Sequence, residues 1–276
     1  MATILGLLAA LAYGTSDFSG GVGSRRSPPT VVTTLAQMFS VLAGLVAVSL
    51  YGGVGPTRAS VGWGSLSGIG SAVGLLALYR GLSVGSMSVV ATASAVLTAA
   101  IPAAVGLLSG EQVPLAAKVG MGAAVIGIAS VTRQSDGKAT ERTGVGSGVV
   151  AGTAFGLLFV ALARAGTRSG AWPLLSGQLV ALVLLAPLAW RSVRRGANWR
   201  TAAGPSGAAG LLGGLATLLF LIAAGRGHLA TAAVLSALYP AVTVALARIF
   251  LRERWTRTQA VGYLLAGAAI VLIGAG

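Results

Sequence analysis

The sequence predicts an all-α integral membrane protein whose ten transmembrane helices form two inverted five-helix repeats. Three observations lead to this fold class. First, 55% of the 276 residues are hydrophobic and 9% are charged, whereas about a quarter of the residues of a soluble domain are charged. Second, the charged residues separate ten long uncharged stretches, most of which approach or exceed the roughly 20 apolar residues of one bilayer crossing. Third, the second half of the chain resembles the first at an offset of 142 residues.

The first half supplies five spans between its charged residues. The first stretch, 1–16, reaches the length of a span when it continues past Asp17, and the fifth, 119–132, does so when it starts before Lys118, at about Pro114. No Lys or Arg precedes the first apolar run, so we expect a retained helix rather than a cleaved signal peptide. The expected helices are 3–23, 31–50, 61–80, 87–108 and 114–132.

The second half repeats this pattern after a short polar connection. The segment from Arg133 to Arg142 is the only connection of soluble character, with polar and turn residues between two apolar blocks. The uncharged stretches that follow predict helices at 144–165, 173–190, 204–224, 229–250 and 256–275. The expected division is therefore a first repeat at 1–134, a connecting loop at 135–142 and a second repeat at 143–276.

The 142-residue offset aligns particular residue types as well as whole helices. Glu111 aligns with Glu253, a match that carries weight because the chain has only five acidic residues, and Ser94 aligns with Ser236. Because each half has an odd number of spans, the second half enters the membrane from the side opposite to the first. Inverted repeats of this kind recur in secondary transporters, which alternate between outward and inward openings.

Positive charge is distributed unevenly between the two sets of connections. Connections after the odd-numbered spans hold fourteen of the 19 Lys and Arg residues, and the others hold five. Because cytoplasmic connections are enriched in Lys and Arg, we expect a multi-pass protein of the cell membrane with both termini on the non-cytoplasmic side. The fourteen are Arg25, Arg26, Arg80, Arg133, Lys138, Arg142, Arg191, Arg194, Arg195, Arg200, Arg248, Arg252, Arg254 and Arg257.

Composition also argues against several kinds of site. The chain has no cysteine and one histidine, His228, which disfavours thiolate or imidazole metal sites, and no glycine-rich phosphate loop is present. The arginines lie between apolar stretches and form no single basic face, so nucleic acid is not an expected partner. We expect no cofactor and no metal, with a small-molecule substrate and the lipid bilayer as partners.

Several motifs resemble those of a known family. The opening Ala12-Tyr13-Gly14-Thr15-Ser16-Asp17-Phe18, the serines Ser94 and Ser236, and the pair Gly110-Glu111 are similar to the ten-helix drug/metabolite transporter superfamily, specifically to proteins with two EamA-type repeats. Arg252-Glu253 departs from the usual Gly-Glu pair, and the charge distribution opposes the termini-inside orientation of many members. The resemblance implies carriage of small metabolites, amino-acid-like or drug-like, usually outward, through a central cavity shared by the repeats.

The sequence therefore predicts a secondary transporter that works by alternating access. One alternative is an integral-membrane enzyme acting on a lipid-linked substrate, although no cluster of acids and histidines lies in the predicted spans. The other is a membrane subunit that transports nothing.

Asp17 is the main candidate functional residue. It is the only carboxylate far inside a predicted span, where a charged group is costly unless it faces a wet cavity or a partner. It either couples transport to a proton or contacts substrate, or else it anchors the helix end close to Arg25 and Arg26.

Other polar and aromatic residues inside the predicted spans are candidates for lining a substrate cavity. Serines often bond to their own helix backbone and tyrosines often lie at the membrane interface, so each has a structural alternative. The candidates are Tyr13, Gln37, Tyr79, Ser94, Phe155, Gln178, Ser236 and Tyr239.

Glu111 and Glu253 end the fourth span of each repeat, and we expect a shared structural role for them. Carboxylates are favoured at helix starts, so each is expected to brace the turn into the next helix. Small residues four apart, as at Gly64 and Gly68 or at Gly210 and Gly214, predict close helix packing, either static or between moving bundles. Exposed stripes of this kind also leave a homodimer open.

Overall fold

The computed structural model describes residues 2–110, 115–116, 118–120, 122–123, 126, 139–166, 168–225, 238–253 and 257–275. The elements that it defines in these ranges are all helices, which confirms the all-α expectation for this part of the chain. They are α1 (Ala2–Ser24), α2 (Pro29–Leu50), α3 (Arg58–Val84), α4 (Met87–Leu108), α6 (Ala139–Ala165), α7 (Trp172–Arg194), α8 (Trp199–Gly225), α10 (Tyr239–Phe250) and α11 (Arg257–Ala275).

The described helices match the expected spans, with longer ends in several cases. Most of the expected span 114–132 and the first part of 229–250 lie outside the described residues. Within the described residues, six helices are long and apolar enough to cross a membrane, namely Pro29–Leu50, Arg58–Val84, Met87–Leu108, Thr143–Ala165, Trp172–Arg194 and Trp199–Leu219. Two shorter apolar helices, Tyr239–Phe250 and Ala260–Leu272, follow them.

Helix α3 shows why the sequence-based ends were too short. It begins at Arg58 instead of residue 61 because Thr57 and Ser60 cap each other: the Ser60 N–H donates to Thr57 Oγ1 (3.1 Å) and the Thr57 N–H donates to Ser60 Oγ (2.8 Å). It also continues past Arg80, which lies on an exposed face, to Val84. A charged residue thus marked the edge of the apolar stretch but not the end of the helix.

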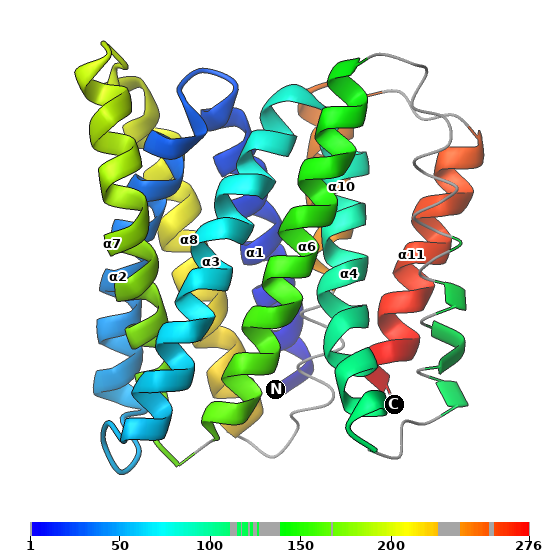
Figure 1. Ribbon diagram of the computed structural model, residues 1–276. Coiled ribbons are helices and arrows are strands. Elements are labelled where there is room, and N and C mark those ends of the chain that lie inside the picture. Colours follow the sequence, from blue (N-terminus) through cyan, green and yellow to red (C-terminus); the bar gives the residue numbers. More distant parts are fainter. Residues whose placement is uncertain are drawn as a thin grey trace.

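The helices run side by side as a bundle (Figure 1). The N-terminal end of α1 and the C-terminal end of α11 lie at the same end of this bundle. Helix α1 runs away from that end, whereas α6, the first helix after the central connection, runs toward it. The arginines that follow α1, α7 and α10 therefore gather at the end opposite the termini, which we call the arginine-rich end.

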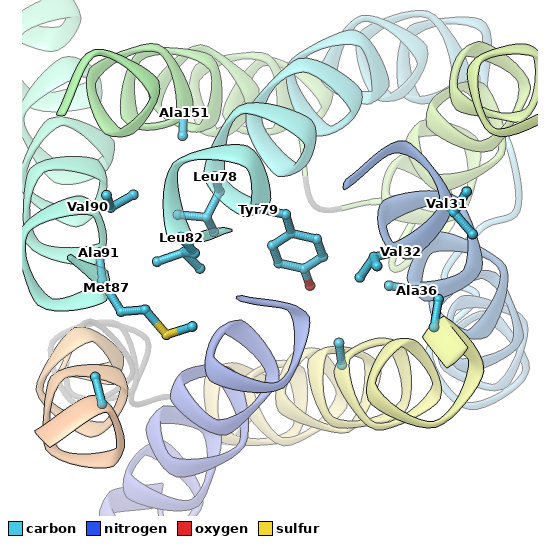
Figure 2. Packing of buried hydrophobic residues seen from close by; sticks show 13 residues of the cluster. Val31, Val32, Ala36, Leu78, Tyr79, Leu82, Met87, Val90, Ala91 and Ala151 are labelled. Carbon is cyan, nitrogen blue, oxygen red and sulfur yellow. The ribbon is translucent and has the colours of Figure 1, made fainter. Parts of the chain in front are cut away.

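Most helices pack against partners from the other half of the chain. Helix α1 packs mainly against α8 and α10, while α3 packs mainly against α6 and α7. Helix α4 packs against α6, and α2 packs against α7 and α8. The largest core cluster draws residues from both halves, and Figure 2 shows Tyr79 and Leu82 of α3 between Met87 and Val90 of α4 on one side and Val32 of α2 on the other.

Small residues lie where these helices approach most closely. A side chain at Gly68 of α3 would meet the carbonyl oxygen of Gly177 in α7. A side chain at Gly210 of α8 would meet the carbonyl oxygen of Ala36 in α2. The predicted small-residue stripes are therefore packing surfaces between helices of different halves.

Two loops at the end of the bundle that carries the termini are joined through their backbones. The Val54 N–H donates to the Arg168 carbonyl (3.0 Å), and the Ala171 N–H donates to the Tyr51 carbonyl (2.8 Å). Gly53 and Gly170 both adopt positive φ angles, 56° and 55°. Each has the other loop's backbone where a side chain would stand, so glycine is needed at both positions.

Candidate functional site

Asp17 lies well inside α1, because this helix continues to Ser24. Its side chain is half-buried, and it has neither an ion-pair partner nor a hydrogen-bond partner among the described residues. Arg25, the cation that the anchoring alternative invoked, instead donates to the carbonyls of Leu82 (3.1 Å) and Gly85 (3.3 Å). The geometry therefore gives no support to an Asp17–Arg25 anchor.

Tyrosines from two helices meet beside Asp17. Tyr13 lies one turn before Asp17 on α1, and its ring meets the ring of Tyr239 from α10 edge-on, with centroids 6.2 Å apart and planes at 61°. Both hydroxyls lie close enough to Asp17 to interact with it electrostatically. The Tyr13 hydroxyl is also hydrogen-bonded to Thr217 of α8 (2.9 Å). Like Asp17, both tyrosines are half-buried.

A third tyrosine closes the site from the side of α3. Tyr79 is 1% exposed, and its ring lies against Gly20 of α1, where any side chain would collide with it. Its hydroxyl lies near the side chains of Ser16 and Asp17. Ser16 in turn donates to the Ala209 carbonyl of α8 (2.7 Å). Figure 2 shows Tyr79 extending from α3 into the core cluster.

Close backbone contact holds α10 against α1 at the same level. The Thr243 hydroxyl donates to the Gly14 carbonyl (3.1 Å), and the space beside Gly14 is filled by the Tyr239 carbonyl and by Val242. Because α10 begins at Tyr239, Pro240 occupies its first turn, a position where proline is tolerated. Tyr239 therefore lies at the start of this helix, beside Asp17.

The other sequence candidates lie elsewhere in the bundle. The Gln37 amide of α2 donates to the Gln178 carbonyl of α7 (3.2 Å), which makes a separate polar contact between these two helices. Phe155 of α6 packs its ring against Gly74 of α3, and Ser94 of α4 packs against Gly152 of α6. The Ser94 hydroxyl is buried without a hydrogen-bond partner among the described residues. Ser236 falls outside the described residues.

Glu253 makes the densest set of polar contacts of any acid in the described part of the chain. It follows α10, and its carboxylate accepts hydrogen bonds from the Met87 N–H (2.7 Å) and the Ser88 N–H (3.1 Å) at the start of α4. The hydroxyls of Ser86 (3.0 Å) and Ser88 (2.7 Å) donate to it as well. The negative carboxylate thus satisfies backbone donors at a helix N-terminus, where the helix dipole favours it.

Arg25 extends this set of contacts to α1. Its guanidinium lies 3.8 Å from the Glu253 carboxylate and donates to the turn between α3 and α4. We call this group, Arg25, Glu253 and the Gly85–Ser88 backbone with its serine hydroxyls, the Glu253 clasp. It joins the ends of α1, α3 and α10 to the start of α4 at the arginine-rich end.

The sequence predicted the chemistry of Glu253 but placed it on another helix. We expected its carboxylate to brace the turn into the following helix, α11, whereas the helix that it caps is α4 of the other half. The sequence could not show this because residues 86–88 and 253 are brought together only by the packing of α10 against α4. The companion residue Glu111 falls outside the described residues.

Sequence reasoning missed two threonines at the site. Thr217 bonds to Tyr13, and Thr98 of α4 lies near the Tyr239 hydroxyl. Each threonine also donates to a backbone carbonyl one turn earlier, Gly213 for Thr217 and Ser94 for Thr98. The available signal was weak, because threonine in a membrane helix commonly makes only this local bond.

Comparison with known families identifies the second half of the chain. Residues 142–275 match the EamA-like transporter family. This half is an EamA-like domain. The match is consistent with the drug/metabolite transporter superfamily that the sequence motifs resemble. Together with the six long apolar helices of the described residues, the match indicates a multi-pass membrane protein.

A solved structure shares the whole fold around the EamA-like domain. That structure, titled only "Crystal structure of protein", has a TM-score of 0.54 and 16% sequence identity to this chain. The similarity covers 98% of this chain and 95% of that one. At this identity the likeness concerns the fold. No curated protein sequence matches the chain significantly.

Proposed function

We propose that this protein is a secondary transporter that moves small metabolites across the cell membrane by alternating access. The observation that carries the proposal is the position of Asp17, a half-buried carboxylate without an ion-pair or hydrogen-bond partner among the described residues, between helices of both halves. A charged group inside a membrane span marks a substrate or ion pathway by default. The EamA-like domain supports the same conclusion from the family side.

The proposal includes ten spans arranged as two inverted repeats, 1–134 and 143–276, joined by 135–142. The opposite directions of α1 and α6 support the inversion (Figure 1). The exchange of partners supports it too, because α1 packs against α8 and α10 while α6 packs against α3 and α4. Each first helix thus contacts the third and fourth helices of the other half. The EamA-like match to 142–275 fits the second repeat.

Individual contacts support the same symmetry. Gly14 of α1 packs against Val242 of α10, and Gly156 of α6, 142 positions later, packs against Ile101 of α4. A position 142 before Val242 is residue 100, one residue from Ile101. Gly68 and Gly210 also lie 142 positions apart. Their partners, Gly177 and Ala36, are separated by the same offset to within one residue.

Alternating access requires that one end of the pathway closes while the other opens. In this structure the Glu253 clasp joins α1, α3, α4 and α10 at the arginine-rich end, so we propose that it holds that end closed. Our expectation from the charge distribution makes this the cytoplasmic end, with both termini on the other side. Transport is then proposed to run outward, with Asp17 taking up and releasing a proton as the pathway changes sides.

Counterflow in liposomes tests the proposed function. Purified protein reconstituted with an unlabelled solute inside should accumulate the same labelled solute from outside, and Asp17→Asn should abolish the dependence of this exchange on a proton gradient. A chemically altered product in place of exchange would indicate a membrane enzyme. Neither exchange nor product, from protein that keeps its native melting transition, would leave the non-transporting subunit as the better reading.

A further inference from the structure

The groups that keep exposed surface around Asp17 define a chemically distinctive site. Asp17, Tyr13 and Tyr239 are half-buried and keep some exposed surface, whereas Tyr79 is 1% exposed. Thr217, also half-buried, is hydrogen-bonded to the Tyr13 hydroxyl, and the half-buried Thr98 lies near the Tyr239 hydroxyl. A ligand at this position meets one carboxylate, two aromatic rings and neutral hydroxyls.

The charge balance of this site discriminates between ligands. A negative ligand would approach a carboxylate that has no ion-pair partner among the described residues, and this repulsion is strong away from bulk water. A zwitterion would place its ammonium favourably, but its carboxylate would need a cation. The described arginine nearest to Asp17 along the chain, Arg25, is engaged by the Glu253 clasp.

Aromatic rings add a preference among cations. Tyrosine rings attract organic cations through their negative faces, whereas hard metal ions are bound by several oxygen ligands, usually more than one carboxylate. From the juxtaposition of Asp17 with Tyr13 and Tyr239 we infer that the substrate is a monovalent organic cation, an amine or quaternary ammonium compound with an apolar body. This inference rests on the proposed transport function and narrows its substrate class, since the family resemblance points equally to amino acids.

Binding of a permanently charged probe tests the inference independently of transport. The probe is labelled benzyltrimethylammonium, measured by equilibrium dialysis against the purified full-length protein in detergent. Phenylalanine and phenylacetate carry the same ring with zwitterionic and anionic charge and serve as competitors. We expect saturable binding of the cation that neither competitor displaces, and Asp17→Asn to weaken it by about tenfold or more.

Matched variants separate loss of the site from loss of the fold. Asp136→Asn makes the same chemical change in the segment expected to connect the two halves, and it should bind the probe like the natural protein. Tyr239→Phe keeps the ring and should retain most of the affinity, whereas Tyr239→Leu removes the ring and should lose several-fold. These tyrosine variants decide the question even if Asp17→Asn fails to fold.

The possible outcomes bear on the two proposals separately. Binding of phenylalanine or phenylacetate as tight as that of the cation, no binding of the cation at all, or unchanged affinity in Asp17→Asn and Tyr239→Leu would each overturn the inference. If the zwitterion undergoes counterflow and the cation does not, transport stands and the substrate class is wrong. If the cation binds as expected without counterflow of any solute, the ligand class stands and the transport proposal is wrong.

Discussion

Tyr13 and Phe155 occupy matching positions at the 142-residue offset and differ by one hydroxyl. On α6 the Phe155 ring packs against Gly74, a contact that needs no polar partner. On α1 the Tyr13 hydroxyl is bonded to Thr217 and lies near Asp17. At this pair of positions only the first half has a hydroxyl, and the first half also carries the Asp17 carboxylate. The two repeats therefore contribute unequally to the proposed site.

The Tyr13→Phe variant measures what that hydroxyl contributes. Removing it breaks the bond to Thr217, but Thr217 keeps its bond to the Gly213 carbonyl, so we expect a loss of only about 0.5 to 1 kcal/mol in stability. A thermal shift in detergent would record a slightly lower melting temperature. Because the ring remains, affinity for benzyltrimethylammonium should stay nearly constant. A severe loss of binding would instead assign the hydroxyl a direct role.

At the scale of the helices, small residues determine how closely two helices can pack. Gly68 of α3 has the backbone and side chain of α7 directly against it, whereas Gly62 of the same helix has open space around its Cα. The two positions therefore allow the same substitution to be compared in one helix with and without a close neighbour.

Gly68→Ala should destabilise the protein by about 1 to 3 kcal/mol, because the added methyl group forces α3 and α7 apart. Gly62→Ala should be neutral or stabilising by up to about 1 kcal/mol, since alanine favours the helix and meets nothing. Unfolding in mixed micelles with increasing denaturing detergent would measure both. Equal effects at the two positions would contradict the close α3–α7 contact.

The Glu253 clasp is a second contact at this scale, and Glu253→Gln weakens it. The amide keeps one acceptor oxygen but loses the charge that attracts Arg25 and the helix start, so we expect a loss on the order of 1 to 2 kcal/mol. If the clasp closes the arginine-rich end, the variant should also admit reagents there. Since the natural chain has no cysteine, Ser19→Cys provides a single reporter on α1.

Maleimide labelling of Ser19→Cys from the arginine-rich side should rise several-fold when Glu253→Gln is added. Glu141→Gln, the same change in the first turn of α6, is the control and should leave the labelling rate unchanged. Labelling that is insensitive to Glu253→Gln would mean that the clasp braces the fold without gating access.

The positions of the helices could largely be predicted from the sequence, but the contacts between helices could not. Charged residues marked the apolar stretches, so α2 and α4 begin and end within two residues of the expected positions. Asp17 stood out because a carboxylate in a span is rare. Thr98, Thr217 and the Ser86–Ser88 partners of Glu253 did not, because their roles depend on contacts between residues more than a hundred positions apart.

For the molecule as a whole, the uneven distribution of arginine makes a topological prediction. With the ten proposed spans and the arginine-rich end proposed to be cytoplasmic, we expect both termini outside the cytoplasm. A protease-sensitive epitope tag at the C-terminus should therefore be cleaved in intact cells by protease added from outside. A tag that is protected until the membrane is opened would reverse the orientation and, with it, the proposed direction of transport.

The intermingling of helices also constrains how the molecule is made. During synthesis α1, α2 and α3 precede α6, α7 and α8, which supply most of the surfaces that cover them in the finished bundle. Until then, Asp17 and the glycine faces of these early helices must be shielded by lipid, water or the insertion machinery. The packing of the first half is therefore completed only after the second half has been inserted.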